Sequence, residues 1–204
     1  MQIQKNNLGR PDEGRAPAGK IITLAGFMGC GKSTVGKILA RRLCMEFLDL
    51  DEMIEEASRK SIPEIFASEG ERAFRQMEAA ELERFLSKHE GISKCCDSMS
   101  QKEGAVLSLG GGTLTTEACR TLLQGRTICI YLKASIDTLA RNLSGESEGR
   151  PMLKGTDEET ALKERIRSLM AQRASIYEKA ANHIIEVDNL SPEAVADAIT
   201  SAIL

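Results

Sequence analysis

The sequence predicts one α/β domain in which a parallel sheet is covered by helices on both faces. Short apolar runs that are typical of strands alternate with longer stretches that have the apolar spacing of helices. Such alternation is typical of parallel sheets, whose strands are joined by helical crossovers. The length of 204 residues, of which 42% are hydrophobic and 28% charged, suits a single globular domain.

The elements follow one another in a regular order. Residues 1–19 are polar and rich in Gly, Pro and charge, so we expect a flexible N-terminal extension before a domain over 20–204. Strands are expected at 21–26, 46–51, 105–110, 127–134 and 183–188. Helices are expected at 32–43, over most of 52–90, at 113–123, 135–143, 159–181 and 191–204, with a new helix beginning near Pro63. The polar segments 89–104 and 144–158 are expected to be a surface loop and a mobile segment.

Composition excludes several classes of function. The net charge is -3, with 27 basic and 30 acidic residues, and aromatic residues make up 3%, so we expect no nucleic-acid partner. There is no apolar run of about 18 residues and no signal-peptide pattern, which predicts a cytoplasmic protein without a membrane partner. The six cysteines and two histidines lack the spacing of a zinc site or a disulfide framework.

A phosphate-binding loop is the strongest motif in the chain. Residues 26–33, "GFMGCGKS", match the pattern G-x-x-x-x-G-K-[ST] between a strand and a helix. In such a loop the backbone N–H groups and the helix N-terminus surround the phosphates, the lysine reaches the terminal phosphates and the hydroxyl holds Mg²⁺. We therefore expect a nucleotide and Mg²⁺ to bind here, with Lys32 and Ser33 in these roles. A structural glycine-rich turn is the alternative.

Two aspartates end the second strand candidate, "FLDLD". If residues 46–51 form a strand, Asp49 and Asp51 lie on one face, where two like charges repel each other unless a cation or a proton donor sits between them. The alternative is a solvated strand end with two surface acids. This strand follows Ser33 by about one helix, and GTPase base-reading motifs are absent from the sequence, which favours a small-molecule or nucleotide kinase.

Several separated motifs, taken together, resemble the shikimate kinase family over about residues 20–204. They are "GFMGCGKSTVGKILA", "FLDLDEMIEE", "SIPEIFASEGERAFRQME", "LSLGGGT", "RPML" and "LMAQRASIYEKAA". The resemblance implies a three-layer P-loop kinase fold of the nucleoside-monophosphate-kinase type, with a five-stranded parallel sheet flanked by helices. It also implies a substrate-binding segment at about 51–90 and a lid at about 144–158. The implied reaction is Mg²⁺-dependent transfer of the ATP γ-phosphoryl group to the 3-hydroxyl of shikimate, a step of aromatic amino-acid biosynthesis.

The resemblance also assigns roles to single residues on the nucleotide side. Asp49 would hold Mg²⁺ through water beside Ser33, and Asp51 would accept the hydrogen bond of the shikimate hydroxyl and act as the base. Lys32 and the lid residue Arg150 would neutralise charge during transfer. The residues expected to contact the nucleotide are Gly29, Cys30, Gly31, Lys32, Ser33, Thr34, Arg141 and Arg150.

A second group is expected to bind shikimate itself. Two arginines suit a carboxylate because the planar guanidinium group can bind it through two hydrogen bonds. Glu78 lies one helical turn after Arg75 and could fix that side chain. The residues that match the family are Asp51, Arg75, Gly110, Gly111, Gly112 and Arg173, with Phe66 and Phe74 beside the ring. The alternatives are surface charges for the arginines, a tight turn for the glycines and core positions for the aromatics.

Some features depart from the family or leave other functions open. The loop at 91–104 is longer than usual, and "VDNLSPEA" lacks an adenine-side arginine. Cys30 lies in the phosphate loop, where a small residue is usual, and a helix N-terminus can lower the pKa of a thiol, so sensitivity to alkylation is a hypothesis. Another small P-loop kinase, acting on gluconate or a nucleotide, is the alternative enzyme. A kinase-derived binding protein is the alternative that is not an enzyme. We expect a monomer, because no apolar stripe calls for a partner.

Overall fold

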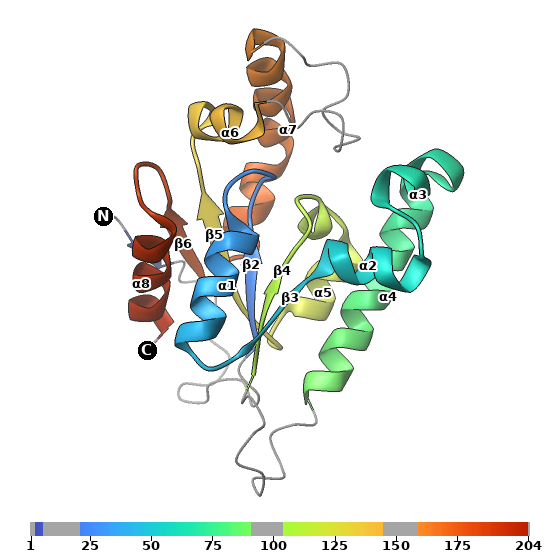
Figure 1. The fold of residues 1–204 in the computed structure, drawn as a ribbon, viewed down its shortest axis with the longest axis horizontal. Helices are drawn as coiled ribbons and strands as arrows, with labels where there is room; N and C mark the ends of the chain where they lie inside the picture. The colour runs from blue at the N-terminus through green and yellow to red at the C-terminus, as the bar shows by residue number, and fades with distance from the viewer. Residues whose placement is uncertain (1–2, 6–20, 91–103, 145–158, 204) are drawn as a thin grey trace, which may run out of the picture.

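The computed structural model describes residues 3–5, 21–90, 104–144 and 159–203 (Figure 1). Six strands form one sheet in the order β1-β6-β5-β2-β4-β3. The strands are β1 (Ile3–Lys5), β2 (Ile21–Ala25), β3 (Glu46–Asp49), β4 (Ala105–Ser108), β5 (Ile128–Lys133) and β6 (His183–Glu186). The helices are α1 (Lys32–Arg42), α2 (Leu50–Ser58), α3 (Ile62–Ser68), α4 (Gly70–Glu90), α5 (Glu117–Leu123), α6 (Ile136–Leu143), α7 (Glu159–Ala180) and α8 (Pro192–Ile203), with a short 3-10 turn, η2 (Thr113–Thr115).

The five strands β2 to β6 pair in parallel, which confirms the predicted parallel sheet. From β2 the chain runs outward to β3, returns to β4 beside β2, and then crosses to β5 and β6 on the other side. The strand order therefore reverses around β2. In open parallel sheets such a reversal leaves a crevice at the carboxyl ends of the strands, where ligands bind.

The N-terminal residues differ from the flexible extension that we expected over 1–19. Residues 3–5 form strand β1, which pairs antiparallel with β6 and places Ile3 opposite Ile185. The edge strand β6 has backbone donors and acceptors that can pair with a further strand. The polar composition of residues 1–19 gave no indication of this pairing. The rest of the segment lies outside the described residues.

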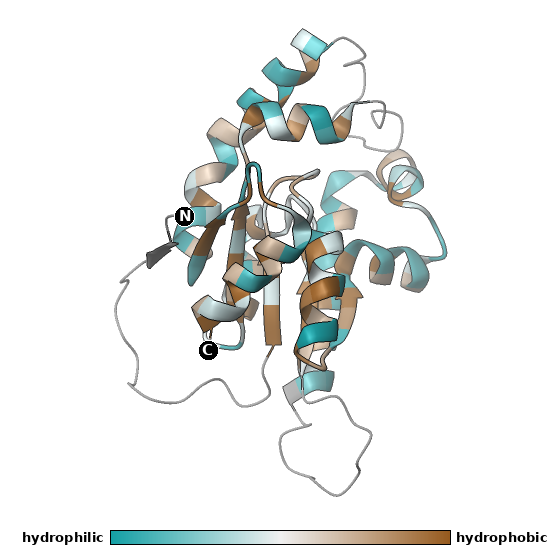
Figure 2. Cartoon of the chain, turned by 60° about the vertical axis from the view of Figure 1, so that its left-hand side comes forward, coloured by the Kyte–Doolittle hydropathy of each residue, from teal (hydrophilic) through white to brown (hydrophobic). Residues whose placement is uncertain are grey.

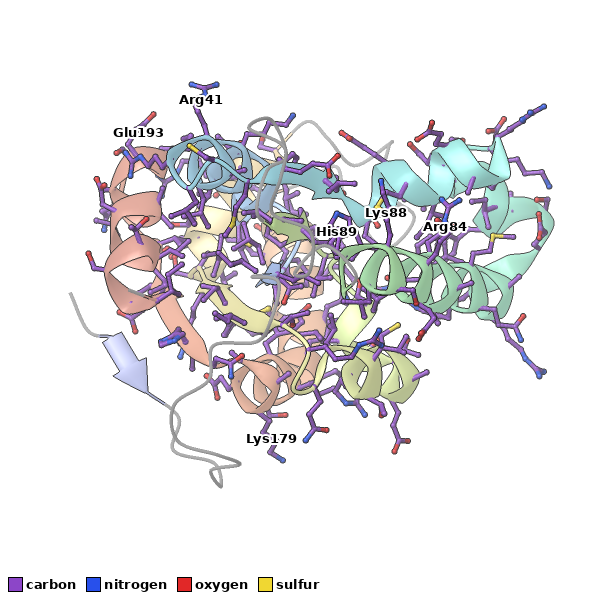
Figure 3. All side chains as sticks on the ribbon, turned by 90° about the horizontal axis from the view of Figure 1, so that it is seen from below. Arg41, Arg84, Lys88, His89, Lys179 and Glu193 are labelled. Atoms are coloured by element: carbon purple, nitrogen blue, oxygen red, sulfur yellow. The ribbon has the colours of Figure 1, made fainter. Side chains whose placement is uncertain are left out.

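Two apolar layers enclose the sheet. One cluster joins the sheet to α1, α6, α8 and the first half of α7, and it includes Leu39 and Ile166, each 0% exposed. The other joins the opposite face to α2, α3, α4, α5 and the end of α7, and it includes Leu82, also 0% exposed. Figure 2 shows the hydrophobic colour along the strands, and Figure 3 shows Arg41 of α1 and Lys179 of α7 on opposite outer faces. This three-layer arrangement is the predicted one.

The strand expected at 46–51 ends earlier than predicted. β3 stops at Asp49, whose side chain accepts a hydrogen bond from the backbone N–H of Asp51 at 3.1 Å and caps helix α2. An aspartate that caps a helix accepts a hydrogen bond from one of the N–H groups that are otherwise unpaired at the helix start. The chain therefore begins a helix at Leu50 instead of continuing as a strand. Asp51 therefore lies in the first turn of α2, and the strand alternation that we used to pair it with Asp49 was the wrong reason.

The new helix near Pro63 is confirmed. Ser61 and Glu64 form a capping box at the start of α3, in which the backbone N–H of Ser61 donates to the Glu64 side chain at 2.8 Å. Pro63 lies in the first turn, where its missing N–H costs nothing.

Among the described residues, none of the helices combines the length and the apolar character needed to cross a membrane.

The apolar layers predict how much stability is lost when a buried side chain is shortened. Leu39→Ala removes a side chain that is 0% exposed between α1 and the sheet. We expect the free energy of unfolding to fall by about 2–5 kcal/mol, through lost burial and the remaining cavity. Leu190→Ala is the control, because Leu190 is 36% exposed, and its effect should stay within about 0.5 kcal/mol. Equilibrium urea unfolding of both variants measures the difference, and equal losses would contradict this placement of the core.

Candidate active site

A cavity of about 570 Å³ opens at the carboxyl ends of the central strands. In Figure 1 this edge of the sheet lies between α6 and α7 on one side and α2 and α3 on the other. Its lining comes from the loop after β2, the start of α1, the end of β3, the start of α2, the end of β4 and the end of α6. The lining residues are Met28, Gly29, Gly31, Lys32, Ser33, Thr34, Asp49, Asp51, Glu52, Ser108, Leu109, Gly111 and Asn142.

The loop between β2 and α1 has the geometry of a phosphate cradle. Gly29 and Gly31 take φ angles of 79° and 91°, which residues with a Cβ rarely adopt. The Lys32 side chain is buried and its Nζ donates to the carbonyl oxygens of Gly26 at 3.0 Å and Phe27 at 3.1 Å. The cation is therefore held over the loop, at the N-terminus of α1, where backbone N–H groups and the helix dipole both attract anions.

Oxygen atoms that could hold a metal ion gather beside this loop. The Ser33 hydroxyl donates to Asp49 Oδ2 at 2.6 Å, and the hydroxyls of Ser33 and Ser108 lie 3.4 Å apart. Hydroxyl and carboxylate oxygens are the ligands that Mg²⁺ prefers, together with water and phosphate oxygens. The set thus fits Mg²⁺, and it brings Ser33 and Asp49 together as the sequence predicted.

Asp51 is the carboxyl group whose acidity is most changed at the cavity. Burial raises its pKa from the usual 3.8 to about 6, and repulsion from Asp49 adds to the rise. The charge of Lys32 acts in the opposite direction, while Glu78 and Glu55 raise the pKa slightly further. A carboxylate with a pKa near 6 is ionised at neutral pH but holds a proton more readily than an ordinary aspartate.

A buried ion pair lies behind Asp51, on helix α4. Arg75 Nη1 donates to Glu78 Oε2 at 2.9 Å, and Arg75 Nη2 donates to Glu71 at 3.2 Å. Glu78 is 0% exposed, and its other oxygen accepts the Thr113 hydroxyl at 2.6 Å. Both oxygens of this buried carboxylate are therefore paired, as burial of a charge requires. The predicted contact between Arg75 and Glu78 is present.

The glycine triplet lies against these charged groups. A Cβ on Gly110 would come within 2.7 Å of Asp51 Oδ1, and a Cβ on Gly112 would come within 2.8 Å of the Arg75 guanidinium carbon. A Cβ on Gly111 would stand 3.2 Å from the backbone nitrogen of Met28 in the phosphate loop. Any side chain at Gly110 or Gly112 would displace a charged group, so the glycines are required by close packing rather than by a turn alone.

Arg173 reaches the same triplet from α7. Its Nη1 donates to the Gly111 carbonyl at 3.2 Å, its guanidinium carbon lies 5.9 Å from the centre of the Phe27 ring, and it is 6% exposed. Tyr177, four residues later on α7, donates its hydroxyl to the same carbonyl. The structure thus places Arg173 and Gly111 together and adds a tyrosine that sequence reasoning did not single out.

The positions of the other predicted residues do not by themselves assign them to a substrate or a nucleotide. Phe66 and Phe74 form an aromatic pair with ring centres 4.8 Å apart, and the Phe74 ring lies 5.2 Å from the Arg75 guanidinium. Arg141 lies at the exposed end of α6, with no contact that assigns it to a nucleotide. Cys30 is 5% exposed, which leaves little of its sulfur open to a thiol reagent. Arg150 and all but the first residue of the predicted lid at 144–158 lie outside the described residues.

Four polar residues of this region escaped the sequence analysis. They are Ser108, Thr113, Asn142 and Tyr177, and Asn142 Nδ2 donates to the Gly29 carbonyl at 2.8 Å. Three of them lie inside or next to motifs that the analysis used, and a polar residue ending an apolar strand was a usable signal for Ser108. Their partners are distant in sequence, so the contacts themselves required the fold.

The phosphate loop lies where the strand order of the parallel sheet reverses, and the buried Glu78 carboxylate and two arginines lie near it. This combination is that of a P-loop kinase of small molecules. The family model described as shikimate kinase matches residues 28–95 and 92–204. A shikimate kinase of Chlorobaculum parvum is 41% identical over 164 residues, covering 78% of this chain and 80% of that protein. One from Mycobacterium avium is 37% identical, covering 87% of this chain and 90% of the other.

Solved structures agree with these relatives. Shikimate kinase from Acinetobacter baumannii in complex with shikimate has a TM-score of 0.78 and 32% identity, over 90% of this chain and 92% of that one. Shikimate kinase from Bacteroides thetaiotaomicron has a TM-score of 0.77 and 29% identity, over 90% of this chain and 98% of that one. The chain belongs to the shikimate kinase family, and its activity is that of a kinase of shikimate.

The raised pKa of Asp51 predicts how the stability of the fold depends on pH. Because its folded-state pKa of about 6 exceeds the usual 3.8, the folded state binds this proton more tightly than the unfolded chain does. The carboxyl therefore supports folding below about pH 4 and loses that contribution as the pH rises to about 6. Asp51→Asn should raise the free energy of unfolding by about 1–3 kcal/mol at pH 7.5 and change it little at pH 4.

Asp188→Asn is the matched control with the opposite sign. Although partial burial raises the pKa of Asp188, its hydrogen bonds outweigh burial and lower it overall, chiefly the one from the Ser135 backbone N–H at 3.0 Å. Its contribution is therefore present at neutral pH and lost as the pH falls, so Asp188→Asn should destabilise at neutral pH. Urea unfolding at both pH values measures the two effects, and the same sign for both variants would refute the assignment.

Proposed function

We propose that the chain transfers the γ-phosphoryl group of ATP to the 3-hydroxyl of shikimate and releases shikimate 3-phosphate and ADP. The observation that carries this proposal is the position of Asp51. Its carboxylate lines the cavity of the phosphate loop and also lies against Gly110, beside the buried pair of Arg75 and Glu78. A hydroxyl bound at Asp51 would thus be between a phosphate site and a carboxylate site.

The phosphate loop is proposed to bind ATP. The N–H groups of Gly29 to Ser33 and Thr34 would surround the β- and γ-phosphates, and Lys32 would exchange its two loop carbonyls for phosphate oxygens. The Ser33 hydroxyl, and Asp49 through water, would hold Mg²⁺, which would supply charge neutralisation at the phosphates. The Ser33–Asp49 hydrogen bond of 2.6 Å supports this pairing, since it already brings the two oxygens together.

Asp51 is proposed to orient the acceptor hydroxyl and to take its proton. The bond between the hydroxyl oxygen and the γ-phosphorus forms as the bond from that phosphorus to the ADP oxygen breaks, and the proton passes to the Asp51 carboxylate. A pKa of about 6 suits this role, because the group is ionised before the reaction and can hold the proton afterwards. Positioning contributes most of the acceleration in phosphoryl transfer, so orientation by Asp51 matters as well as its basicity.

Two arginines are proposed to bind the shikimate carboxylate. Arg75 is held by Glu78 and Glu71, and Arg173 by the Gly111 carbonyl, so both guanidinium groups have fixed orientations. A fixed planar fork loses little entropy when it binds a carboxylate, and two of them favour a carboxylate over the hydroxyl-rich end of a neutral sugar. This arrangement distinguishes the proposal from a kinase of a neutral sugar.

The remaining roles follow from the family. Arg150 is proposed to neutralise the transferring phosphoryl group when the lid closes, and Arg141 to lie beside adenine. Closure of this kind excludes water, which would otherwise hydrolyse ATP. A cytoplasmic location and a monomeric state remain predictions; gel filtration with light scattering measures the latter.

The acceptor and the base are tested together. ADP release from ATP and Mg²⁺ should require shikimate, and should not occur at a comparable rate with gluconate or nucleoside monophosphates. Asp51→Asn should lower kcat by about 10²- to 10⁴-fold, the usual contribution of a general base, while ATP affinity stays unchanged. Removal of Mg²⁺ by a chelator should stop turnover and serves as the control for metal dependence. Turnover with another acceptor would show that the arginines bind a different anion, and tight ATP binding without any turnover would favour a binding protein.

The pH dependence gives a second test of Asp51. Since its carboxylate must be ionised to accept the proton, kcat/KM for shikimate should fall about tenfold per pH unit below its pKa of about 6. Above that pH the same parameter should stay level until another group titrates. ATP affinity measured over the same range controls for titration of the nucleotide. A kcat/KM that stays flat down to about pH 5 would exclude an ionised Asp51 as the base.

A further inference from the structure

Two buried tyrosines lie ring to ring behind the glycine triplet. Tyr131 of β5 and Tyr177 of α7 have ring centres 5.2 Å apart, and each is 1% exposed. Their hydroxyls differ. The Tyr177 hydroxyl donates to the Gly111 carbonyl, whereas the Tyr131 hydroxyl has no hydrogen-bond partner within the described part of the chain. The pair therefore separates the effect of a buried tyrosine ring from the effect of its hydroxyl.

The Gly111 carbonyl joins Tyr177 to Arg173. It accepts from Tyr177 and, at 3.2 Å, from Arg173 Nη1, and a carbonyl has two lone pairs for two such donors. Arg173 and Tyr177 are four residues apart on α7, so their side chains extend from the same face of the helix. Both groups thus converge on one peptide from one helix.

We propose that Tyr177 is a positioning residue for substrate binding. Its hydroxyl fixes the peptide of Gly111, and the Gly111 carbonyl in turn fixes the guanidinium of Arg173, whose remaining N–H groups are left to bind a carboxylate. This inference rests on the proposed function, in which Arg173 binds the carboxylate of shikimate. It adds a residue that does not itself contact the substrate.

The Gly111 peptide needs such a restraint. Gly110 and Gly112 flank it, and glycines leave a peptide freer to rotate than any other neighbours would. The bond from Arg173, at 3.2 Å, is a second restraint on the same carbonyl and lies within the normal range. Burial raises the pKa of Tyr177 to about 12, so its hydroxyl keeps its proton at neutral pH and donates throughout the working range.

Tyr177→Phe and Tyr131→Phe form a matched pair of variants. Each substitution removes one hydroxyl from one of the two rings that pack against each other. Only Tyr177→Phe also removes a hydrogen bond, the one to the Gly111 carbonyl. Tyr177→Phe should raise the KM for shikimate about tenfold, which corresponds to about 1.4 kcal/mol, with the KM for ATP and kcat almost unchanged. Tyr131→Phe should leave all three parameters at the wild-type values. Equal effects of the two variants, or equal changes for ATP and shikimate, would overturn the inference.

A double-mutant cycle tests whether Tyr177 acts through Arg173. In an Arg173→Lys background the planar fork is absent, so adding Tyr177→Phe should raise the KM for shikimate by less than about twofold. If the two losses simply multiply, Tyr177 acts independently of Arg173 and the inference is wrong.

A measurement on the ligand-free protein keeps this test separate from the proposed function. In NMR spectra the guanidinium N–H groups of Arg173 should exchange slowly with water in the wild type and in Tyr131→Phe, and faster in Tyr177→Phe. Fast exchange in the wild type would overturn the inference even if shikimate is the substrate. Slow exchange that depends on Tyr177, combined with no turnover of shikimate, would leave the positioning role intact and refute the proposed function instead.

Discussion

The active site depends on how closely the backbone of residues 110–112 approaches charged side chains from other elements. Gly110 lies against Asp51 of α2, Gly112 against Arg75 of α4, and Gly111 against the phosphate loop. Three successive residues without Cβ let these groups approach the backbone directly. Asp51 and Gly111, which line the cavity of the phosphate loop, are thereby brought next to the buried groups Arg75, Glu78 and Arg173.

This closeness has an energetic cost that the surrounding contacts offset. Asp49, Asp51 and Glu78 bring three carboxylates into one region, and burial, with repulsion from the other two carboxylates, raises the pKa of Asp51. Lys32 opposes the rise, Arg75 and Thr113 pair both oxygens of Glu78, and the Asp49 side chain accepts from Ser33 and from the backbone of Asp51. Functional sites commonly store such unfavourable charge, and the buried apolar layers on both faces of the sheet supply the stability that tolerates it.

Sequence reasoning predicted the sheet, its helices and the phosphate loop because each left a local signal, whereas most of the charged site residues were predicted from the resemblance to a family. The phosphate loop has a fixed spacing, and the parallel strands are apolar runs between helical stretches. Sequence reasoning missed β1, because the pairing of an edge strand depends on another strand far away in the sequence. It also extended β3 to include Asp51, because the alternation of apolar and polar residues does not reveal a helix cap. Contacts such as Tyr177 with Gly111 and Thr113 with Glu78 join positions 66 and 35 residues apart, so only the fold could reveal them.

The corrected position of Asp51 changes the explanation of its chemistry. On a strand beside Asp49 its acidity would be set mainly by that neighbour, but in the first turn of α2 it also meets the positive end of the helix dipole. The pKa of Asp51 is raised, because burial and the nearby carboxylates outweigh the charge of Lys32. The balance keeps the carboxylate ionised at neutral pH, and the first turn of α2 places it at the cavity of the phosphate loop. Moderate basicity and a position beside the phosphate site are the two properties that a base in phosphoryl transfer needs.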